Sequence, residues 1–304
     1  MENGMDADGP ELVLTDRLVK RFGSTVALDG LDLRVRRGQV HGFLGPNGSG
    51  KSTAIRVLLG LIRADAGRAA VLGLDPWSDA TEIHRRVAYV PGEVNLWPNL
   101  TGGETLDLLA SLRGGVDDVR RDELCKIFEL DLRAKGGSYS RGNRQKVALV
   151  AALSTGAELY VFDEPTAGLD PLKEVAFQEC VREIQEEGGT VLLSSHILAQ
   201  VEELADDLTI IQRGRAIESG SLSEMKRLAR SEVEATVGSD PAGLELMPGV
   251  HDVVIEGDRI TCSVDPKGLE DLLRWLLERK VTNLVTRPPT LEDLFLSEYG
   301  KEDE

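Results

Sequence analysis

The sequence predicts an α/β fold for most of the chain, followed by a small α+β domain. Three observations predict it. An apolar strand at 39–44 runs into a glycine-rich loop and then into a helix at 52–62. Short apolar runs then alternate with helical patterns up to about residue 220, which is typical of a parallel sheet with helices packed on it. The composition changes at 225–231, within the charged stretch "SLSEMKRLARSEVEA".

The elements of the first domain, residues 11–225, follow one another in order. β-like runs separated by glycine and charged turns fill 11–44, and they predict an antiparallel β subdomain that leads into the first buried strand. The helix at 52–62 has apolar residues three to four positions apart. The later elements are a strand at 87–91, helices within about 101–135, a helix at 144–154, buried strands ending at 162 and 196, and a hairpin around 213–215.

The second domain, residues 231–304, shows a different pattern. Strand-like alternation and a turn at Gly257 and Asp258 predict a small sheet. The expected elements are a strand at 232–237, a hairpin at 252–264, a helix at 269–280, a strand at 283–286 and a helix at 291–299. No phosphate or metal motif occurs in this part, so we expect it to support assembly or regulation rather than chemistry.

Composition excludes several classes of protein. The 304 residues include 52 acidic and 35 basic side chains, a formal charge of -17, which argues against a surface that coats nucleic acid. Three separated cysteines without a CxxC pair predict neither a disulfide framework nor a zinc site, as in a reducing cytoplasm. The start of the chain is acidic rather than signal-like, and no apolar run reaches the roughly 18 residues of a membrane span. We therefore expect a soluble protein.

The stretch "GPNGSGKST" matches the phosphate-binding pattern G-x-x-x-x-G-K-[ST] and lies between a predicted strand and a predicted helix, the context that this motif requires. Its glycines let backbone N–H groups turn inward, and the helix amino terminus adds positive potential for anions. Lys51 is expected to reach the β- and γ-phosphates, and the Ser52 hydroxyl to ligate Mg²⁺. The predicted nucleotide-binding residues of this loop are Gly45, Asn47, Gly48, Ser49, Gly50, Lys51, Ser52 and Thr53.

Two adjacent carboxylates, Asp163 and Glu164, follow a buried strand in "VFDEPTAGLD". Like charges at such a place are costly unless a cation lies between them or one of them handles protons. A triphosphate site needs a carboxylate for Mg²⁺ at the end of a second strand, and Asp163 suits that role. Glu164 is then expected to take the proton of an attacking water. The bland alternative is a pair of solvated acids at a strand end.

Four further stretches resemble the motifs of ABC transporter ATPases. "YSRGNRQK" is similar to the family's signature motif, "TAGLD" to its D-loop and "SSH" to its H-loop, while Phe22 stands at the position that stacks on adenine. Ser140 follows Lys51 by 89 residues, which leaves room for a helical subdomain at about 93–145. The resemblance covers about 11–220. It implies a P-loop NTPase core of the ABC type, with an antiparallel β subdomain, a helical subdomain and a small C-terminal α+β accessory domain.

Within the family the chain most resembles the ATPase subunits of two-component drug and antibiotic exporters, whose membrane permease is a separate chain. The tail stretch "PTLEDLFL" at 289–296 supports this. The resemblance implies a head-to-tail homodimer in which Ser140 and Gly142 contact the γ-phosphate of the partner's nucleotide, beside a helix starting near Arg144. Asp170 would link the two sites and His196 would contact the γ-phosphate. It also implies a cytoplasmic subunit held at the inner face of the membrane by the permease.

The sequence departs from the family pattern at two places. Arg141 and Asn143 replace a glycine and a glutamine of the signature. After "YVP" the family has a glutamine that touches Mg²⁺ and the attacking water, whereas Gly92 and Glu93 stand here. Either Glu93 swings in as a metal ligand, or it is a solvated loop acid and water fills its place.

Other functions remain to be weighed. The main alternative is a soluble ABC ATPase that acts on DNA or ribosomes without transport. The single signature, the short insertion before it and the acidic charge disfavour this alternative. A nucleotide-binding regulator without turnover would lack Glu164 or His196, and both are present. We therefore expect an ATPase that uses ATP and Mg²⁺, works with a permease and does not bind nucleic acid.

Overall fold

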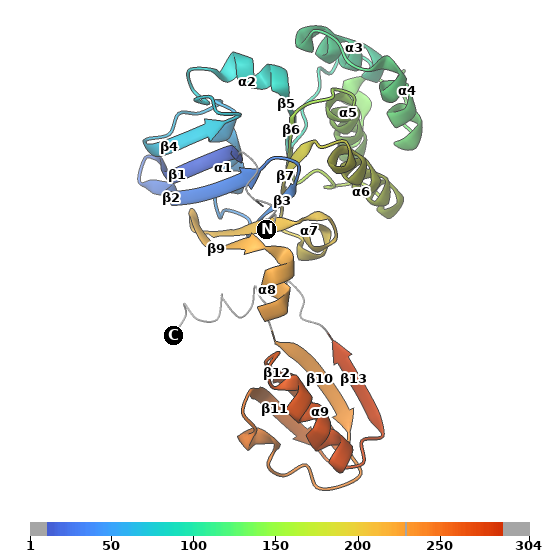
Figure 1. Cartoon of the computed structure of the whole chain (residues 1–304). Helices are drawn as coiled ribbons and strands as arrows, with labels where there is room; N and C mark the ends of the chain where they lie inside the picture. The colour runs from blue at the N-terminus through green and yellow to red at the C-terminus, as the bar shows by residue number, and fades with distance from the viewer. Residues whose placement is uncertain (1–10, 229, 288–304) are drawn as a thin grey trace, which may run out of the picture. The chain divides into compact units, whose positions relative to one another are not determined.

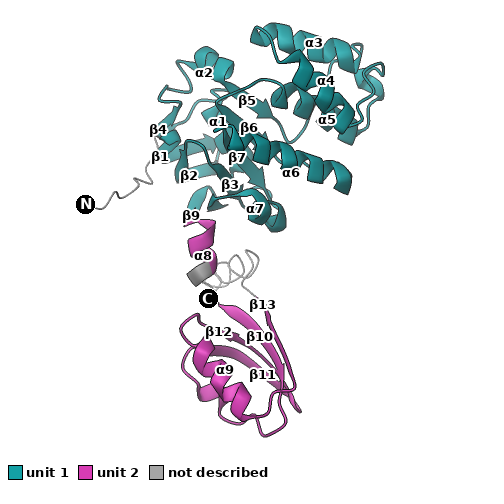
Figure 2. Ribbon diagram, turned by 45° about the vertical axis from the view of Figure 1, so that its right-hand side comes forward, with its two compact units in different colours: residues 1–219 teal, residues 220–304 magenta. Residues whose placement is uncertain are grey.

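The computed structural model describes residues 11–228 and 230–287. Figure 2 shows two compact units, which divide between Ser219 and Gly220. Sequence composition placed the boundary later, at 225–231, so helix α8 (Leu222–Leu228) belongs to the second unit rather than the first. A charged stretch marks exposed residues and need not coincide with the point where the chain leaves a packed unit.

A six-stranded sheet in the order β5-β6-β7-β3-β8-β9 forms the centre of the first unit (Figure 1). The pairs from β5 through to β8 are parallel. The inner strands are buried almost throughout, which explains why the sequence shows them as continuous apolar runs. Their bounds are β3 Val40–Leu44, β5 Val87–Val90, β6 Leu159–Asp163, β7 Thr190–Ser195, β8 Asp207–Gln212 and β9 Arg215–Ser221.

The order of this sheet brings together strands that are far apart in the chain. β6, β7 and β3 are neighbours, and because they are parallel their carboxyl ends meet at one edge. In parallel sheets the loops at this edge form the ligand site. The glycine-rich loop after β3 and the acidic pair after β6 therefore lie on the same side of the molecule.

A second, antiparallel sheet has the order β2-β1-β4, with bounds β1 Glu11–Phe22, β2 Thr25–Arg36 and β4 Ala66–Val71. It confirms the antiparallel β subdomain. Its inner residues share one apolar core with β3 and helix α1 (Lys51–Leu58), where Leu31, Phe43 and Ile55 are fully buried. This common core fixes the antiparallel sheet against the glycine-rich loop.

The other helices of the first unit are α2 Ala80–Arg86, α3 Gly102–Arg113, α4 Asp118–Ile127, α5 Arg141–Leu153, α6 Pro171–Glu186 and α7 Leu198–Leu204, with a 3₁₀ turn at Gly136–Ser138. Helices α3 and α4 confirm the helical region predicted after residue 101. The helix expected near Arg144 begins three residues earlier, because Ser140 caps it by accepting the Asn143 N–H at 3.2 Å. Sequence analysis did not identify α2, α6, α7 or β4.

The second unit has a four-stranded sheet in the order β11-β12-β10-β13, with helix α9 packed on it (Figure 1). Leu272 and Leu276 of α9 are buried in a cluster with Val233 and Ile260 of the sheet. The bounds are β10 Ser231–Thr236, β11 Val250–Glu256, β12 Arg259–Val264, α9 Leu269–Glu278 and β13 Asn283–Arg287, with a 3₁₀ turn at Leu244–Leu246. The predicted helix at 291–299 lies outside the described residues.

Among residues 11–228 and 230–287, no helix is both long enough and apolar enough to cross a membrane.

Candidate functional site

The glycine-rich loop has the backbone of a phosphate cradle. It leaves β3 at Leu44 and enters α1 at Lys51. A Cβ atom at Gly45 would lie 2.3 Å from the carbonyl oxygen of Ile211, so only glycine fits there. Gly50, the residue before the helix, has a φ of 116°, and a Cβ atom there would lie 2.7 Å from the carbonyl oxygen of Ala27. The glycines are therefore required by close packing as well as by the turn.

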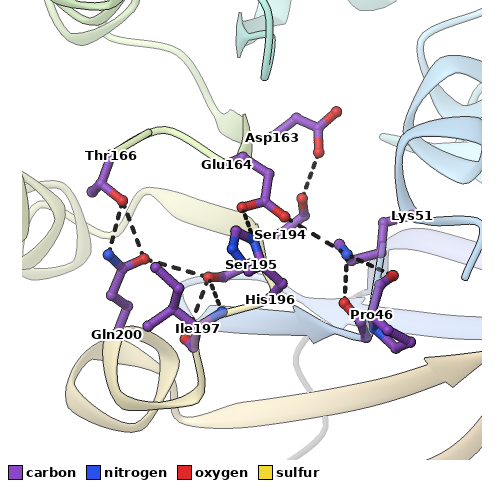
Figure 3. A network of polar contacts seen from close by, with 11 residues as sticks. Pro46, Lys51, Asp163, Glu164, Thr166, Ser194, Ser195, His196, Ile197 and Gln200 are labelled. Atoms are coloured by element: carbon purple, nitrogen blue, oxygen red, sulfur yellow. Dashed lines mark hydrogen bonds and ion pairs between the residues drawn. The ribbon is translucent and has the colours of Figure 1, made fainter. Parts of the chain in front are cut away.

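Lys51 lies at the base of this loop and is almost fully buried. Its Nζ donates to the carbonyl oxygens of Gly45 at 2.5 Å and Pro46 at 3.2 Å, and lies 3.6 Å from Oε1 of Glu164 (Figure 3). Burial lowers the pKa of Lys51 from its ordinary value, and the charges of Glu164 and Asp163 oppose that effect. The two acids therefore partly offset the effect of burial on this ammonium group.

The acidic pair ends β6 with its two side chains pointing to different partners. Asp163 is buried and accepts a hydrogen bond from the Ser194 hydroxyl of β7 at 2.5 Å. Glu164 has a φ of 53°, which costs a non-glycine residue of order 1 kcal/mol and reverses the chain sharply after the strand. Asp163 and Glu164 have different partners, which suits the different roles expected of them from the sequence.

His196, which follows β7, contacts the second acid. Its Nδ1 lies 2.5 Å from Oε2 of Glu164, and its side chain is about half exposed. Glu164 thus lies between Lys51 on one side and His196 on the other, as Figure 3 shows. A few residues on, Gln200 and Thr166 exchange hydrogen bonds that hold α7 against the turn after β6.

Several residues of this region line one pocket of about 570 Å³. Asn47 and Ser52 of the glycine-rich loop line it together with Asp163, Glu164 and His196. The pocket therefore combines an anion cradle, a serine hydroxyl, two carboxylates and an imidazole. That is the set of groups that a nucleoside triphosphate with a divalent cation requires.

Gly92 and Glu93 also line this pocket. A Cβ atom on Gly92 would lie 3.2 Å from the carbonyl oxygen of Asp163 and 3.6 Å from Cβ of Glu164. The position that the family fills with glutamine is thus directly beside the acidic pair. Glu93 is exposed on the pocket wall, and none of the interactions found for the described residues gives its carboxylate a partner.

Ten predicted residues are not in the wall of this pocket, of which six belong to the glycine-rich loop (Gly45, Gly48, Ser49, Gly50, Lys51 and Thr53) and four lie elsewhere. Phe22 ends β1, is 51% exposed and has the Lys20 ammonium 5.3 Å from its ring centroid. Ser140 is the exposed N-cap of α5. Gly142 packs on the turn after β6, where a Cβ atom would meet the carbonyl oxygen of Gly168 at 2.3 Å. Asp170 caps α6 through the Lys173 N–H at 3.1 Å. Within one chain they do not join the pocket.

Several residues that line or support this pocket were not predicted as site residues from the sequence. Tyr89, Arg56 and Arg141 line the pocket, and Ser194 holds Asp163. Burial and the charge of Asp163 raise the pKa of Tyr89 to about 12. Arg56 follows Ser52 by four residues in a helix, so the sequence already indicated that the two side chains share one helix face. Only the sheet order brings Tyr89 and Ser194 to the acids.

A second, apolar pocket of about 470 Å³ lies next to the first. Tyr89, Pro91 and Asn95 line both pockets. The apolar pocket also includes three exposed side chains, Leu61, Trp97 and Leu112. An exposed apolar hollow of this kind commonly marks a partner surface.

Fold and site together define a P-loop nucleotide-binding ATPase, and comparison with known proteins identifies its family. A family model described as "ABC transporter" matches residues 28–167. A second model, described as "AAA domain, putative AbiEii toxin, Type IV TA system", matches 136–201. The daunorubicin resistance ATP-binding protein DrrA3 of Streptomyces coeruleorubidus is 35% identical over 303 residues, which cover 95% of this chain and 96% of that protein.

Other relatives also match most of the chain. The bacitracin transport ATP-binding protein BcrA of Bacillus licheniformis is 30% identical, covering 95% of this chain and 97% of its own. The Nod factor export ATP-binding protein I of Burkholderia thailandensis is 35% identical, covering 93% and 95%. A solved structure of an ATP-binding subunit of an ABC transporter is 32% identical, with a TM-score of 0.66, over 71% of this chain and 92% of that one. The chain belongs to the ATP-binding subunits of ABC transporters and is an ATPase.

The comparisons confirm the predicted fold class and family. They favour the transporter interpretation over the soluble alternative acting on DNA or ribosomes, because the relatives are named for resistance, transport and export.

Proposed function

We propose that this chain powers an exporter, as a head-to-tail homodimer bound to a separate membrane permease, and that it expels a drug, antibiotic or other amphiphile. The contact of Glu164 with both Lys51 and His196 carries the catalytic part of the proposal. The names of the full-length relatives, which concern daunorubicin, bacitracin and Nod factor, support export of amphiphilic compounds. Localisation at the inner face of the membrane follows from the permease partner.

In the proposed mechanism, Glu164 accepts the proton of the attacking water, and His196 contacts the γ-phosphate while holding the Glu164 carboxylate in place. Lys51 binds the β- and γ-phosphates and exchanges its carbonyl partners for phosphate oxygens. Closure of the dimer around ATP and its opening after hydrolysis transmit motion to the permease. Phe22 stacks on adenine with the ring face that Lys20 leaves open.

Mg²⁺ fits the residues present. Ser52 and Asp163 both line the pocket, and Mg²⁺ is commonly bound by few protein ligands together with substrate phosphates and water. Among the described residues no cluster of three or more His, Cys, Asp or Glu could hold a metal alone, which agrees with a site completed by the nucleotide. When bound, the ion neutralises phosphate charge. Ser194 fixes the Asp163 carboxylate for it through the 2.5 Å hydrogen bond.

Glu164→Gln tests the catalytic assignment. The amide is nearly isosteric but a poor base, so the variant should bind ATP with unchanged affinity and lose turnover by a factor of about 100 to 10,000. ATP affinity and hydrolysis are measured on the same preparation. Hydrolysis near the wild-type rate would assign the base role to another group.

Mixing inactive variants tests the head-to-tail dimer. Ser140→Arg blocks the partner's site and Lys51→Ala blocks the chain's own site. In a mixed dimer both lesions can fall on one composite site and leave the other intact. The mixture should therefore recover hydrolysis that neither variant has alone, and a mixture without activity would contradict the arrangement.

We propose that the apolar pocket binds an apolar segment of the permease, because it shares wall residues with the nucleotide pocket. Leu112→Asp should abolish co-purification with the permease and export while ATP binding by the isolated chain is retained. Leu172→Asp is the matched control, since Leu172 is 78% exposed, against 74% for Leu112, and lies away from the pocket. If both variants lose co-purification and export equally, the apolar pocket is not the permease-binding site.

A further inference from the structure

Arg141 stands at an unexpected place for a residue of the signature motif. Residues of this motif are proposed above to serve the nucleotide of the partner chain, yet Arg141 lines the nucleotide pocket of its own chain. It is the first residue of α5, directly after the cap Ser140. A Cβ atom on Gly168 would lie 3.7 Å from Cγ of Arg141, so the stem of the arginine lies close to the turn that follows Glu164.

Two further residues of α5 lie against the turn that follows Glu164. Gly142 approaches the carbonyl oxygen of Gly168 so closely that a Cβ atom would lie at 2.3 Å. The buried Gln145 of the same helix donates through Nε2 to the carbonyl oxygen of Pro165 at 2.9 Å. The first turns of α5 thus contact the segment that directly follows Asp163 and Glu164.

The charges on the pocket wall show what Arg141 could do. Three carboxylates line the pocket, of which Asp163 is held by Ser194 and Glu164 by Lys51 and His196. Glu93 is the third. For the described residues, no hydrogen bond or ion pair is found for the side chain of Glu93 or for that of Arg141. A pocket that must accept triphosphate therefore carries an extra unpaired negative charge and, facing the same space, an unpaired guanidinium.

We propose that Arg141 acts on the nucleotide site of its own chain, where its guanidinium offsets the carboxylate of Glu93 so that ATP can enter. Arg141 is in this role a positioning residue, and Ser140, one residue earlier, serves the other chain's site. The two departures from the family pattern then compensate each other. This inference rests on the proposed head-to-tail dimer.

Arg56 is the competing candidate, since it lines the same pocket from α1 and is also exposed. Its charge acts on Tyr89, whose pKa it lowers against the effect of burial. The stem of Arg141 lies close to Gly168 in the turn after the acidic pair, whereas Arg56 lies on α1. We therefore assign the pairing with Glu93 to Arg141 and use Arg56 as the comparison.

The first experiment tests the charge pairing in ATP binding. Arg141→Ala should raise the Kd for ATP about five- to tenfold, a size expected for a partly exposed charge close to others. Glu93→Gln in the same chain should bring Kd back to within about twofold of the Glu93→Gln single variant. Arg141→Lys should retain most of the affinity. Arg133→Ala, an exposed arginine that lines none of the pockets, should match wild type.

The restoration of the Kd for ATP by Glu93→Gln must be specific to the Arg141→Ala variant. If Glu93→Gln restores Arg56→Ala equally well, or fails to restore Arg141→Ala, the pairing is wrong. An unchanged Kd in Arg141→Ala also overturns it. A fall in kcat at saturating ATP with Kd unchanged would assign Arg141 to hydrolysis and reject its role in admitting ATP.

The second experiment tests which chain's site Arg141 serves. Arg141→Glu should inactivate the homodimer, and its mixture with Lys51→Ala should stay inactive, because each mixed dimer then has one lesion in each site. The mixture of Ser140→Arg with Lys51→Ala should recover, which shows that the dimer and its independent sites exist. If the Ser140 mixture fails, the proposed dimer is wrong. If the Arg141 mixture recovers, the present inference is wrong.

A third mixture separates an effect on one site from an effect on both. A chain carrying Lys51→Ala and Arg141→Glu is mixed with wild type and compared with Lys51→Ala mixed with wild type. If Arg141 serves only its own chain, the second lesion falls on a site that is already inactive, and the two mixtures have equal activity. Lower activity in the doubly substituted mixture shows that Arg141 also acts on the partner's site, which overturns the assignment.

Discussion

Ser194→Ala tests how the fold prepares the carboxylate that is proposed to hold Mg²⁺. The Ser194 side chain is fully buried, and its hydroxyl donates to Oδ1 of the buried Asp163 at 2.5 Å. A hydrogen bond to a charged group contributes about 1.5–3 kcal/mol, and its loss leaves a buried carboxylate short of one donor. We expect the free energy of unfolding of the first unit to fall by about 2 kcal/mol.

The same substitution should weaken the metal site. Groups that orient a metal ligand typically matter by about 10- to 100-fold in metal affinity or activity. The Mg²⁺ concentration for half-maximal hydrolysis should therefore rise about tenfold or more, while ATP binding without metal changes little. Ser154→Ala is the control, because Ser154 is equally buried but donates to a neutral partner, the carbonyl oxygen of Val150, at 2.9 Å. It should cost about 1 kcal/mol and leave the Mg²⁺ dependence unchanged.

Unfolding of the first unit can be followed by tryptophan fluorescence during urea titration. The chain has three tryptophans, of which Trp77 and Trp97 lie in the first unit and Trp275 in the second. In a Trp275→Phe background the signal comes from the first unit alone, which avoids mixing two transitions. If Ser194→Ala costs no more than the control and leaves Mg²⁺ dependence unchanged, Ser194 does not position Asp163.

Three further predictions concern other parts of the chain. Burial lowers the pKa of His41 to about 4, so as the pH falls the unfolded chain binds a proton on this histidine before the folded chain does. The free energy of unfolding should therefore fall as the pH drops from about 6.5 to 4, by about 2 kcal/mol between pH 7 and pH 5. Urea titration of a His41→Asn variant, which is neutral at this position, should not show this loss. A chain ending at Arg230 should bind ATP with unchanged affinity in calorimetry, because all the proposed site residues precede it, and failure to fold would show that the tail belongs to the main core. If Glu93 ligates Mg²⁺, Glu93→Ala should weaken the Mg²⁺ dependence of hydrolysis and uncouple hydrolysis from the permease. The variant is titrated with Mg²⁺ in the presence and in the absence of the permease. If it matches wild type in both titrations, Glu93 is a solvated acid and not a metal ligand.

Much of the fold and site could be predicted because its information is local. The turn residues and the helix start of the glycine-rich loop lie within nine consecutive residues, 45–53, and the strand directly precedes them. Asp163 and Glu164 were recognisable because an apolar run stops at them. Helix α6 was missed although its signals are local as well: Asp170 caps it, Pro171 opens it, and Phe177 and Val181 repeat at helical spacing.

The pairing of side chains across strands could not be predicted in the same way. Ser194 meets Asp163 only because β7 lies beside β6 in register, with the two residues as direct partners. A serine in "LLSSH" gives no sign of which strand will be its neighbour. Likewise the contact of Glu164 with His196 depends on the backbone reversal at Glu164, which no residue preference indicates.

The role proposed for Arg141 could not be predicted by comparison with the family's motif. A motif assigns roles to the residues that match it, so a mismatch reads only as a weaker match. In the folded chain the mismatched arginine reaches a pocket wall that also carries the mismatched Glu93. Two departures that are far apart in sequence and opposite in charge thus face one space, and their combined charge is what a triphosphate meets. The energetic meaning of each substitution therefore depends on the other, and single-position comparison with the family cannot supply it.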